Sequence, residues 1–331
     1  MTHPLVRRRG VLAAAGAVAL GGSAAALRAR SAPTPVGSLR LLTGGTLGVY
    51  YRFGQALADQ MQAAADGLRV TTESSSGSVQ NLLRLAGPDA GATVVAFVAA
   101  DAAALAVRGQ RPFRDVVRVG ALARLYDDYL HLVTRPGSGI KKVADLTGRR
   151  FSIGPDTSGT ALIAQRVLKL AGVGLGRSTG RSTRVEELPI NESVEALESG
   201  DIDAFFWSGG VPTTGVSELA RKTAISLVPM EREATAMYAE YGRPYRVGTV
   251  PPGVYGLKVP VGTLAVPNLL VTPTATPPAT VLWIDALLFG SRTAIGRKVT
   301  AANTLDARTA ISVAPVGLHP GAVDYFRTHK P

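Results

Sequence analysis

Hydrophobic and polar residues follow two alternating patterns from residue 38 to about residue 225. Short apolar runs are typical of buried strands, and the longer stretches between them repeat apolar residues every three or four positions, which is typical of helices. In residues 49–65, for example, Tyr50, Phe53 and Leu57 would share one helical face. The pattern predicts strands near 38–45, 68–74, 92–100, 117–123, 129–135 and 202–210, and helices near 49–65, 79–86, 101–107 and 190–200.

This alternation of strands and helices predicts an α/β fold of mainly parallel sheets flanked by crossover helices. A strand, a Gly/Ser/Thr loop and a helix follow one another at 39–57 and again at 150–168, which suggests one such unit in each of two lobes with a ligand cleft between them. Residues 250–273 are rich in proline, leucine and valine without a helical period, so we expect strands there that cross between the lobes. The predicted division is 36–125 with 250–331 for lobe 1, and 126–249 for lobe 2.

The N-terminus has the form of an export signal. Residues 7–12, RRRGVL, precede an apolar and uncharged stretch that ends at Leu27. Arginines before such a stretch are typical of a secretory signal, including the twin-arginine type, and Ala24 and Ala26 fit a small-x-small cleavage rule. An uncleaved anchor is the alternative, but the run is short for a membrane span. We assign residues 1–35 to export, without a lipoprotein anchor because no cysteine follows.

Composition narrows the function classes. Hydrophobic residues make up 46% and charged residues 18%, which indicates a globular protein. There is no cysteine, so disulfides, thiolate metal sites and cysteine nucleophiles are excluded. The net charge is +12, but the basic residues are scattered and form no arginine-rich helix, which argues against nucleic acid as a partner.

Three loops between a predicted strand and a predicted helix share a Gly/Ser/Thr composition, namely 44–48, 74–78 and 155–160. In a parallel α/β sheet such loops lie at the carboxyl ends of strands, where the next helix presents unpaired N–H groups and a partial positive charge. Glycine allows a ligand to approach the backbone, and hydroxyls donate to an anion. The loops match neither a P-loop nor a dinucleotide fingerprint. We expect them to face a common cleft, although helix capping alone also favours these residues.

Catalytic groups are scarce. His131 lies in an apolar run and is predicted to be a strand histidine, and no metal-ligand spacing or nucleophile elbow is present. The carboxylates that could serve an enzyme in the cleft are Asp101, Asp127 and Asp128. We expect no cofactor and no metal.

Five stretches occur in the order found in one known family. They are LLTGGTLGVYYRFGQALA, ESSSGSVQNLLRL, ALARLYDDYLHLVTRPGSGIKKVADLTGRRFSIGPDTSGT, LESGDIDAFFWSGGVPT and VPPGVYG, between residues 38 and 272. In these stretches the chain resembles the TAXI family, the solute-binding proteins of TRAP-type secondary transporters. The resemblance implies an extracytoplasmic two-lobed protein with the type II periplasmic-binding-protein fold. Such a protein closes on a small carboxylate, glutamate-like or a dicarboxylate, and delivers it to membrane permease subunits.

The resemblance also implies which residues contact the solute. In the first lobe they are Thr46, Gly48, Tyr50, Ser74, Gly77, Ser78 and Asn81. In the second lobe they are Tyr126, Ser158, Gly159, Thr160, Gly209, Val211 and Pro212. Asp101 and Trp207 complete the candidate set, and Tyr50, Tyr126 or Trp207 would cover the apolar part of the solute.

The sequence departs from the family pattern at three places. Ala99 stands where a glutamine two residues before Asp101 is usual, and the second loop reads Ser-Ser-Ser-Gly-Ser instead of Ser/Thr-Gly-Gly-Ser. Trp207 is bulkier than the usual aliphatic residue. These departures bear on the identity of the solute more than on the fold.

Two other functions are compatible with the same fold. An enzyme would need one of the cleft carboxylates, and a sensory binding protein would present its ligand state to a membrane receptor. The expected protein is a monomeric, non-enzymatic solute-binding protein.

Overall fold

The computed structural model describes residues 34–87, 93–174 and 183–329. The predicted export segment therefore lies almost entirely outside the described residues. Within the described part of the chain, no helix is both long enough and apolar enough to cross a membrane.

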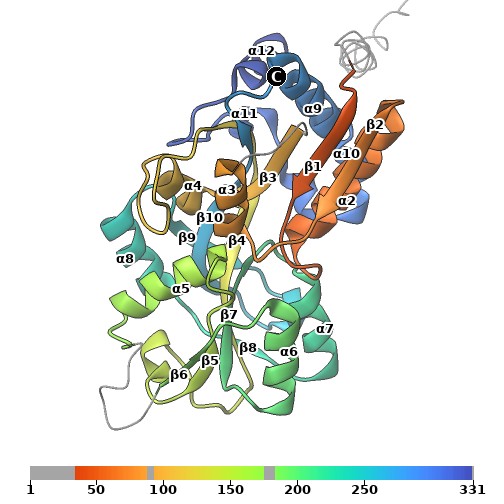
Figure 1. Ribbon diagram of the computed structural model, residues 1–331. Helices are drawn as coiled ribbons and strands as arrows, with labels where there is room; N and C mark the ends of the chain where they lie inside the picture. The colour runs from red at the N-terminus through yellow and green to blue at the C-terminus, as the bar shows by residue number, and fades with distance from the viewer. Residues whose placement is uncertain (1–33, 88–92, 175–182, 330–331) are drawn as a thin grey trace, which may run out of the picture.

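The described strands form one mixed sheet in the order β2-β1-β3-β10-β4-β7-β5-β6. Two further strands pair off this path, β8 with β4 and β9 with β10. Figure 1 shows two halves, one above the other, that are joined through β4 and β10. The strands are β1 (Gly37–Leu42), β2 (Leu68–Glu73), β3 (Thr93–Ala99), β4 (Val119–Thr134), β5 (Arg150–Ser152), β6 (Arg184–Glu186), β7 (Ala204–Gly209), β8 (Ser226–Leu227), β9 (Arg246–Val250) and β10 (Val261–Pro273).

The predicted parallel pairing holds for the outer strands, because β1 pairs with β2 and β3, and β5 pairs with β6 and β7, all in parallel. The centre is antiparallel, since β4 and β10 run in opposite directions and pair with each other and with β3 and β7. The α/β fold class is confirmed, with a mixed sheet in place of two mainly parallel ones.

Strands β4 and β10 each run through both halves. The first part of β4 pairs with the end of β10, and its last part pairs with β7. Asp127 faces Pro267 across the ladder, and a register shift follows between Pro267 and Leu269. We expected two strands at 117–123 and 129–135, but the polar pair of aspartates does not interrupt backbone pairing. We therefore propose lobe boundaries near residues 126 and 267, the latter about seventeen residues later than the expected crossing at 250.

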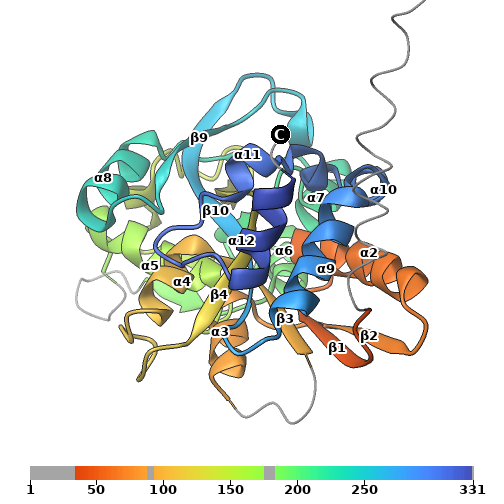
Figure 2. The same ribbon diagram turned by 90° about the horizontal axis from the view of Figure 1, so that it is seen from above.

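Each half has helices on both faces of its strands. Figure 2 shows α9 (Pro278–Gly290) and α12 (Pro320–Thr328) on one side of the upper strands, and α3 (Ser78–Ala86) on the other. The upper strands separate two hydrophobic cores, and residues of β3 alternate between them. Val95 and Phe97 pack in one core, and Val94, Ala96 and Val98 pack in the other. A continuous apolar run therefore fits a strand that is covered on both faces.

The remaining helices divide between the halves. The upper half also contains α2 (Val49–Ala64), α4 (Ala100–Ala106), α10 (Arg292–Lys298) and α11 (Ala307–Ala310). The lower half contains α5 (Gly159–Leu170), α6 (Ile190–Ser199), α7 (Thr214–Lys222) and α8 (Glu231–Tyr241). Helix α8, which the sequence pattern did not predict, packs beside β9 and β10 through Ala234 and Met237.

Candidate functional site

A cavity lies between the two halves, where loops of both meet the long central strands. The space open to the centres of water molecules is about 70 Å³, enough for a few of them, so the cavity suits a small solute. Its walls come from the loops before α2 and α3 in the upper half and from those before α5 and α6 in the lower half. Its floor includes Tyr126 and Asp128 of β4.

Four helix N-termini converge on this cavity. The residue before the first turn is Gly48 for α2, Gly77 for α3, Ser158 for α5 and Pro189 for α6, and all four line the cavity. Only Ser158 caps its own helix, by accepting a hydrogen bond from Ala161 N at 2.9 Å. Backbone N–H groups at a helix N-terminus that lack a side-chain cap are free to donate to a ligand, and the helix dipole adds a partial positive charge. The four helix N-termini together therefore favour binding of an anion in the cavity.

Glycine is favoured at two positions where these helices begin, Gly77 before α3 and Gly159 in the first turn of α5. Gly77 has a φ of 126°, which side chains of other residues rarely allow. At Gly159 a Cβ would lie only 3.0 Å from Ser78 Oγ across the cleft. The backbones of α3 and α5 approach closely there because neither loop carries a bulky side chain.

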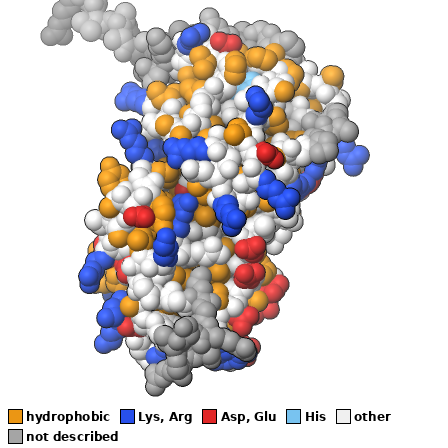
Figure 3. Space-filling view, turned by 60° about the vertical axis from the view of Figure 1, so that its left-hand side comes forward, with side chains coloured by type: hydrophobic (Ala, Val, Ile, Leu, Met, Phe, Trp, Pro, Cys, Tyr) orange, Lys and Arg blue, Asp and Glu red, His pale blue; other side chains and the backbone are white. Residues whose placement is uncertain are grey.

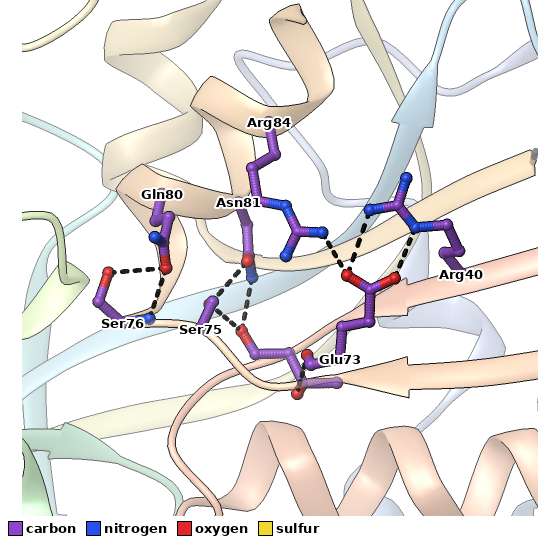
Figure 4. Close-up of polar contacts among 8 residues, drawn as sticks. Arg40, Glu73, Ser75, Ser76, Gln80, Asn81 and Arg84 are labelled. Carbon is purple, nitrogen blue, oxygen red and sulfur yellow. Dashed lines mark hydrogen bonds and ion pairs between the residues drawn. The ribbon is translucent and has the colours of Figure 1, made fainter. Parts of the chain in front are cut away.

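The loop before α3 is held by polar contacts that Figure 4 shows. Asn81 Nδ2 donates to Thr43 O at 2.7 Å and to Phe97 O at 2.9 Å, and Asn81 Oδ1 accepts from Ser75 Oγ. At the end of β2, Glu73 pairs with Arg40 and Arg84, and these contacts lower the pKa of Glu73 to about 2. The loop therefore meets the cavity in a fixed shape.

Hydrogen bonds join the halves around the cavity. Gln80 N donates to Thr157 O at 3.0 Å, and Ser76 Oγ lies 2.6 Å from Thr157 Oγ1. At another edge, Arg52 Nη1 donates to Thr214 Oγ1 at 3.0 Å. The structure is thus a closed arrangement of the two halves.

The floor of the cavity is polar and deeply buried. Tyr50 OH donates to Asn268 Oδ1 and lies 3.4 Å from Ser78 Oγ. Burial raises the pKa of the Asp128 carboxyl to about 7, although the nearby Asn268 side chain pulls the other way. Burial and the Asp128 charge raise the pKa values of Tyr50 and Tyr126, so both phenols are neutral.

Asp128 is the one carboxylic acid among the described residues that line the cavity, and no lysine, arginine or histidine lines it. On the face drawn in Figure 3, the lysine and arginine side chains are spread over both halves. His131 lies in β4 outside the cavity, and burial lowers its pKa to about 4. Positive potential in the cavity therefore comes from backbone dipoles.

Most of the residues named from the sequence meet at this cavity. The structure places the following around it: Gly48, Tyr50, Gly77, Ser78, Tyr126, Ser158, Gly159, Thr160, Trp207 and Gly209. Trp207 Nε1 donates to Thr213 Oγ1 at 2.9 Å, which fixes the indole, and the ring approaches Gly48.

Six named residues do not line it. Thr46, Ser74 and Pro212 are exposed to solvent, and Val211 packs at the edge of a core in the lower half. Asn81 uses its amide to hold the loop, as described above. Asp101 lies in α4 and accepts a hydrogen bond from Tyr245 OH at 2.8 Å, away from the cavity.

The sequence reasoning missed the wall at the start of α6, which includes Pro189, Ile190 and Ser193. This loop has none of the Gly/Ser/Thr composition that marked the others, although its helix was predicted. Asp128 was considered only as a catalytic candidate, yet a carboxylate within an apolar strand was a signal for a buried polar site.

The fold is similar to that of several solved proteins at low identity. MatC from Rhodopseudomonas palustris, solved with bound malate, is 14% identical with a TM-score of 0.53, covering 89% of this chain and 98% of that chain. The periplasmic binding protein BugD is 12% identical with a TM-score of 0.51, covering 88% and 97%. The periplasmic aliphatic sulphonate-binding protein SsuA from Escherichia coli is 13% identical with a TM-score of 0.47, covering 90% and 84%.

At such identities the likeness concerns the fold alone, which is that of periplasmic binding proteins. The sequence comparison covers most of the chain, since residues 41–328 match the NMT1-like family. The chain therefore belongs to the NMT1-like family.

Proposed function

We propose that this protein captures a small carboxylate outside the cytoplasm and delivers it to a TRAP-type membrane transporter, as a solute-binding protein of the TAXI type. The observation that carries the proposal is the convergence of four helix N-termini, two from each half, on one enclosed cavity. Binding an anion there requires both halves at once, which links capture of the solute to closure.

The charge balance supports an anionic solute. A helix N-terminus stabilises a nearby negative charge by about 0.3–1 kcal/mol at the surface, and by up to about 2 kcal/mol in a partly buried position. Hydroxyl groups of Ser78, Ser158 and Thr160 add further polar groups around the cavity. These groups can neutralise one carboxylate without a cationic side chain.

The delivery step is supported by the sequence. The five ordered stretches resemble those of the TAXI family, which serves TRAP-type permeases, and the arginine-led apolar segment at the N-terminus has the form of an export signal. The closed arrangement supplies a surface that differs from that of an open form, which a permease could distinguish.

A binding screen tests the proposal. The protein is mixed with monocarboxylates, dicarboxylates and acidic amino acids at millimolar concentration, and thermal unfolding and isothermal titration calorimetry are recorded. We expect at least one of these classes to raise the Tm by several degrees, because a ligand that binds only the folded protein stabilises it. If no member of the panel binds, the carboxylate proposal is wrong.

A substitution at the cavity tests whether the solute binds there. Gly159→Val places branched carbon atoms against Ser78 at the closed interface and should lower the affinity at least tenfold. Gly317→Val is the matched control, because a Cβ there meets nothing within 4 Å. Equal affinities of the two variants would contradict the assignment of the site.

A further inference from the structure

Two residues that line the floor of the cavity, Asp128 and Tyr126, each carry a buried polar atom with no hydrogen-bond partner of good geometry within the described part of the chain, and so does Asn268, which lies outside the lining with its side chain beside the Asp128 carboxyl. The three atoms are Asp128 Oδ1, Tyr126 OH and Asn268 Nδ2. Asp128 is 5% exposed, Tyr126 is 4% exposed and Asn268 is fully buried. Because an unsatisfied buried polar group costs free energy, the free atoms of the two lining residues, Asp128 and Tyr126, indicate a site that a ligand completes.

These atoms lie where the two long strands cross between the halves. Asp128 pairs with Val266 across the ladder, and Asn268 falls within the register shift of β10. A ligand bound to Tyr126 and Asp128 therefore contacts β4 directly, where this strand passes from one half to the other.

The surroundings of Asp128 show which ligand chemistry fits. The charged groups that act on it are Asp127 of the same strand and Asp101 of α4, and both disfavour its ionised form. Asp127 is itself paired with Arg124 and Arg246. Tyr50 of α2 and Tyr126 of β4 face it as neutral phenols.

Without a cation on the protein side, an ionised Asp128 would repel a second carboxylate of a solute. A positively charged donor on the solute would instead neutralise Asp128 and satisfy its free oxygen. A zwitterion thus fits both ends of the cavity, with its carboxylate at the helix N-termini and its ammonium at the hinge.

We propose that Asp128 is the specificity-determining residue of this site, which binds an ammonium group of the solute at the hinge and selects against dianions. This inference rests on the proposed function, because it assumes that a carboxylate occupies the same cavity. Tyr126 completes the polar floor, and Asn268 acts from outside the cavity lining as the neighbour of the Asp128 carboxyl.

The inference predicts a pH dependence of known sign. In the closed structure burial raises the pKa of Asp128 to about 7, so near neutral pH a substantial part of the molecules carries a protonated Asp128. An ammonium binds the ionised form, so capture of the solute releases a proton. Affinity should rise about tenfold between pH 6 and pH 8 and then level off.

The test compares ligands that differ in one group. An α-amino acid, its des-amino monocarboxylate and the dicarboxylate of equal length are titrated into the full protein by calorimetry, in two buffers of different ionisation enthalpy. We expect the amino acid to bind at least tenfold more tightly than either analogue, with proton release at pH 6.5.

Asp128→Asn should abolish both that preference and the proton release. Asp285→Asn is the control, since Asp285 is also a buried carboxyl with a raised pKa but lies outside the cavity. The inference is overturned if the des-amino compound binds as tightly as the amino acid, or if Asp128→Asn keeps the preference. Absence of binding by all three compounds would instead contradict the proposed function.

Discussion

Replacing the buried carboxyl of Asp285 by an amide should change how the stability of the protein depends on pH. Asp285 lies in α9, is fully buried, and neither of its carboxyl oxygens has a hydrogen-bond partner in the described structure. Burial raises its pKa well above the ordinary value of 3.8. The folded protein therefore keeps the proton that the unfolded chain releases.

The magnitude follows from proton linkage. Above about pH 4 the unfolded state binds one proton fewer, so the free energy of unfolding falls by about 1.4 kcal/mol per pH unit while the folded carboxyl stays protonated. The decline continues with rising pH for as long as the folded carboxyl keeps its proton, so its size is on the order of a few kcal/mol. Asp285→Asn cannot ionise, so its stability should lack that part of the decline and exceed that of the wild type at pH 7.

Urea unfolding followed by circular dichroism at pH 5, 6 and 7 measures this difference. Asp59→Asn is the control, because Asp59 is exposed and forms only a surface ion pair with Lys298, which is expected to contribute less than about 1 kcal/mol. Parallel pH profiles for the wild type and Asp285→Asn would refute the reasoning, since they would mean that the carboxyl ionises alike in both states.

Two further predictions concern closure of the two halves, and a third concerns the response of Trp207 to solute binding. Thr157→Val removes the hydroxyl contact with Ser76 between the halves. The solute affinity measured by calorimetry should therefore fall about two- to tenfold, with little change in Tm. An unchanged affinity would mean that the contact does not favour closure. Tyr245→Phe removes the buried hydrogen bond from Tyr245 OH to Asp101 of α4. Small-angle scattering of this variant should show a larger radius of gyration in the absence of solute, and profiles identical to those of the wild type would count against a role of this contact in closure. Trp207 lines the cavity, so its fluorescence should change on solute binding in the wild type and this response should vanish in Trp207→Phe.

Local patterns predicted much of the fold. The apolar run of β3 was identified because a strand buried on both faces needs apolar residues at every position. The loops before α2, α3 and α5 were identified because glycine and hydroxyl residues are favoured where helices begin. Both signals act within a few residues of the chain, so the sequence displays them directly.

The membership of the candidate site could be predicted only in part. Residues of one loop lie in different surroundings: Gly77 and Ser78 line the cavity, whereas Ser74 is exposed to solvent. Asp101 follows a strand that ends near the cavity, yet its carboxyl contacts Tyr245 on another side. The direction of a side chain at a strand end depends on the first turn of the following helix, which composition does not specify.

The sequence by itself determined that this chain folds into strands and helices in alternation and that three of its loops suit an anion. Only the tertiary structure decided that β10 lies between β3 and β4, which brings Asn268 next to Asp128. Only the tertiary structure also placed the start of α6 at the same cavity as the other three helix ends. The physical reason is that strand order and register arise from pairing between segments far apart in the chain, and each such pairing depends on the packing of both halves. The buried carboxyl of Asp128 can therefore be proposed as a binding group only once these distant strands are in place.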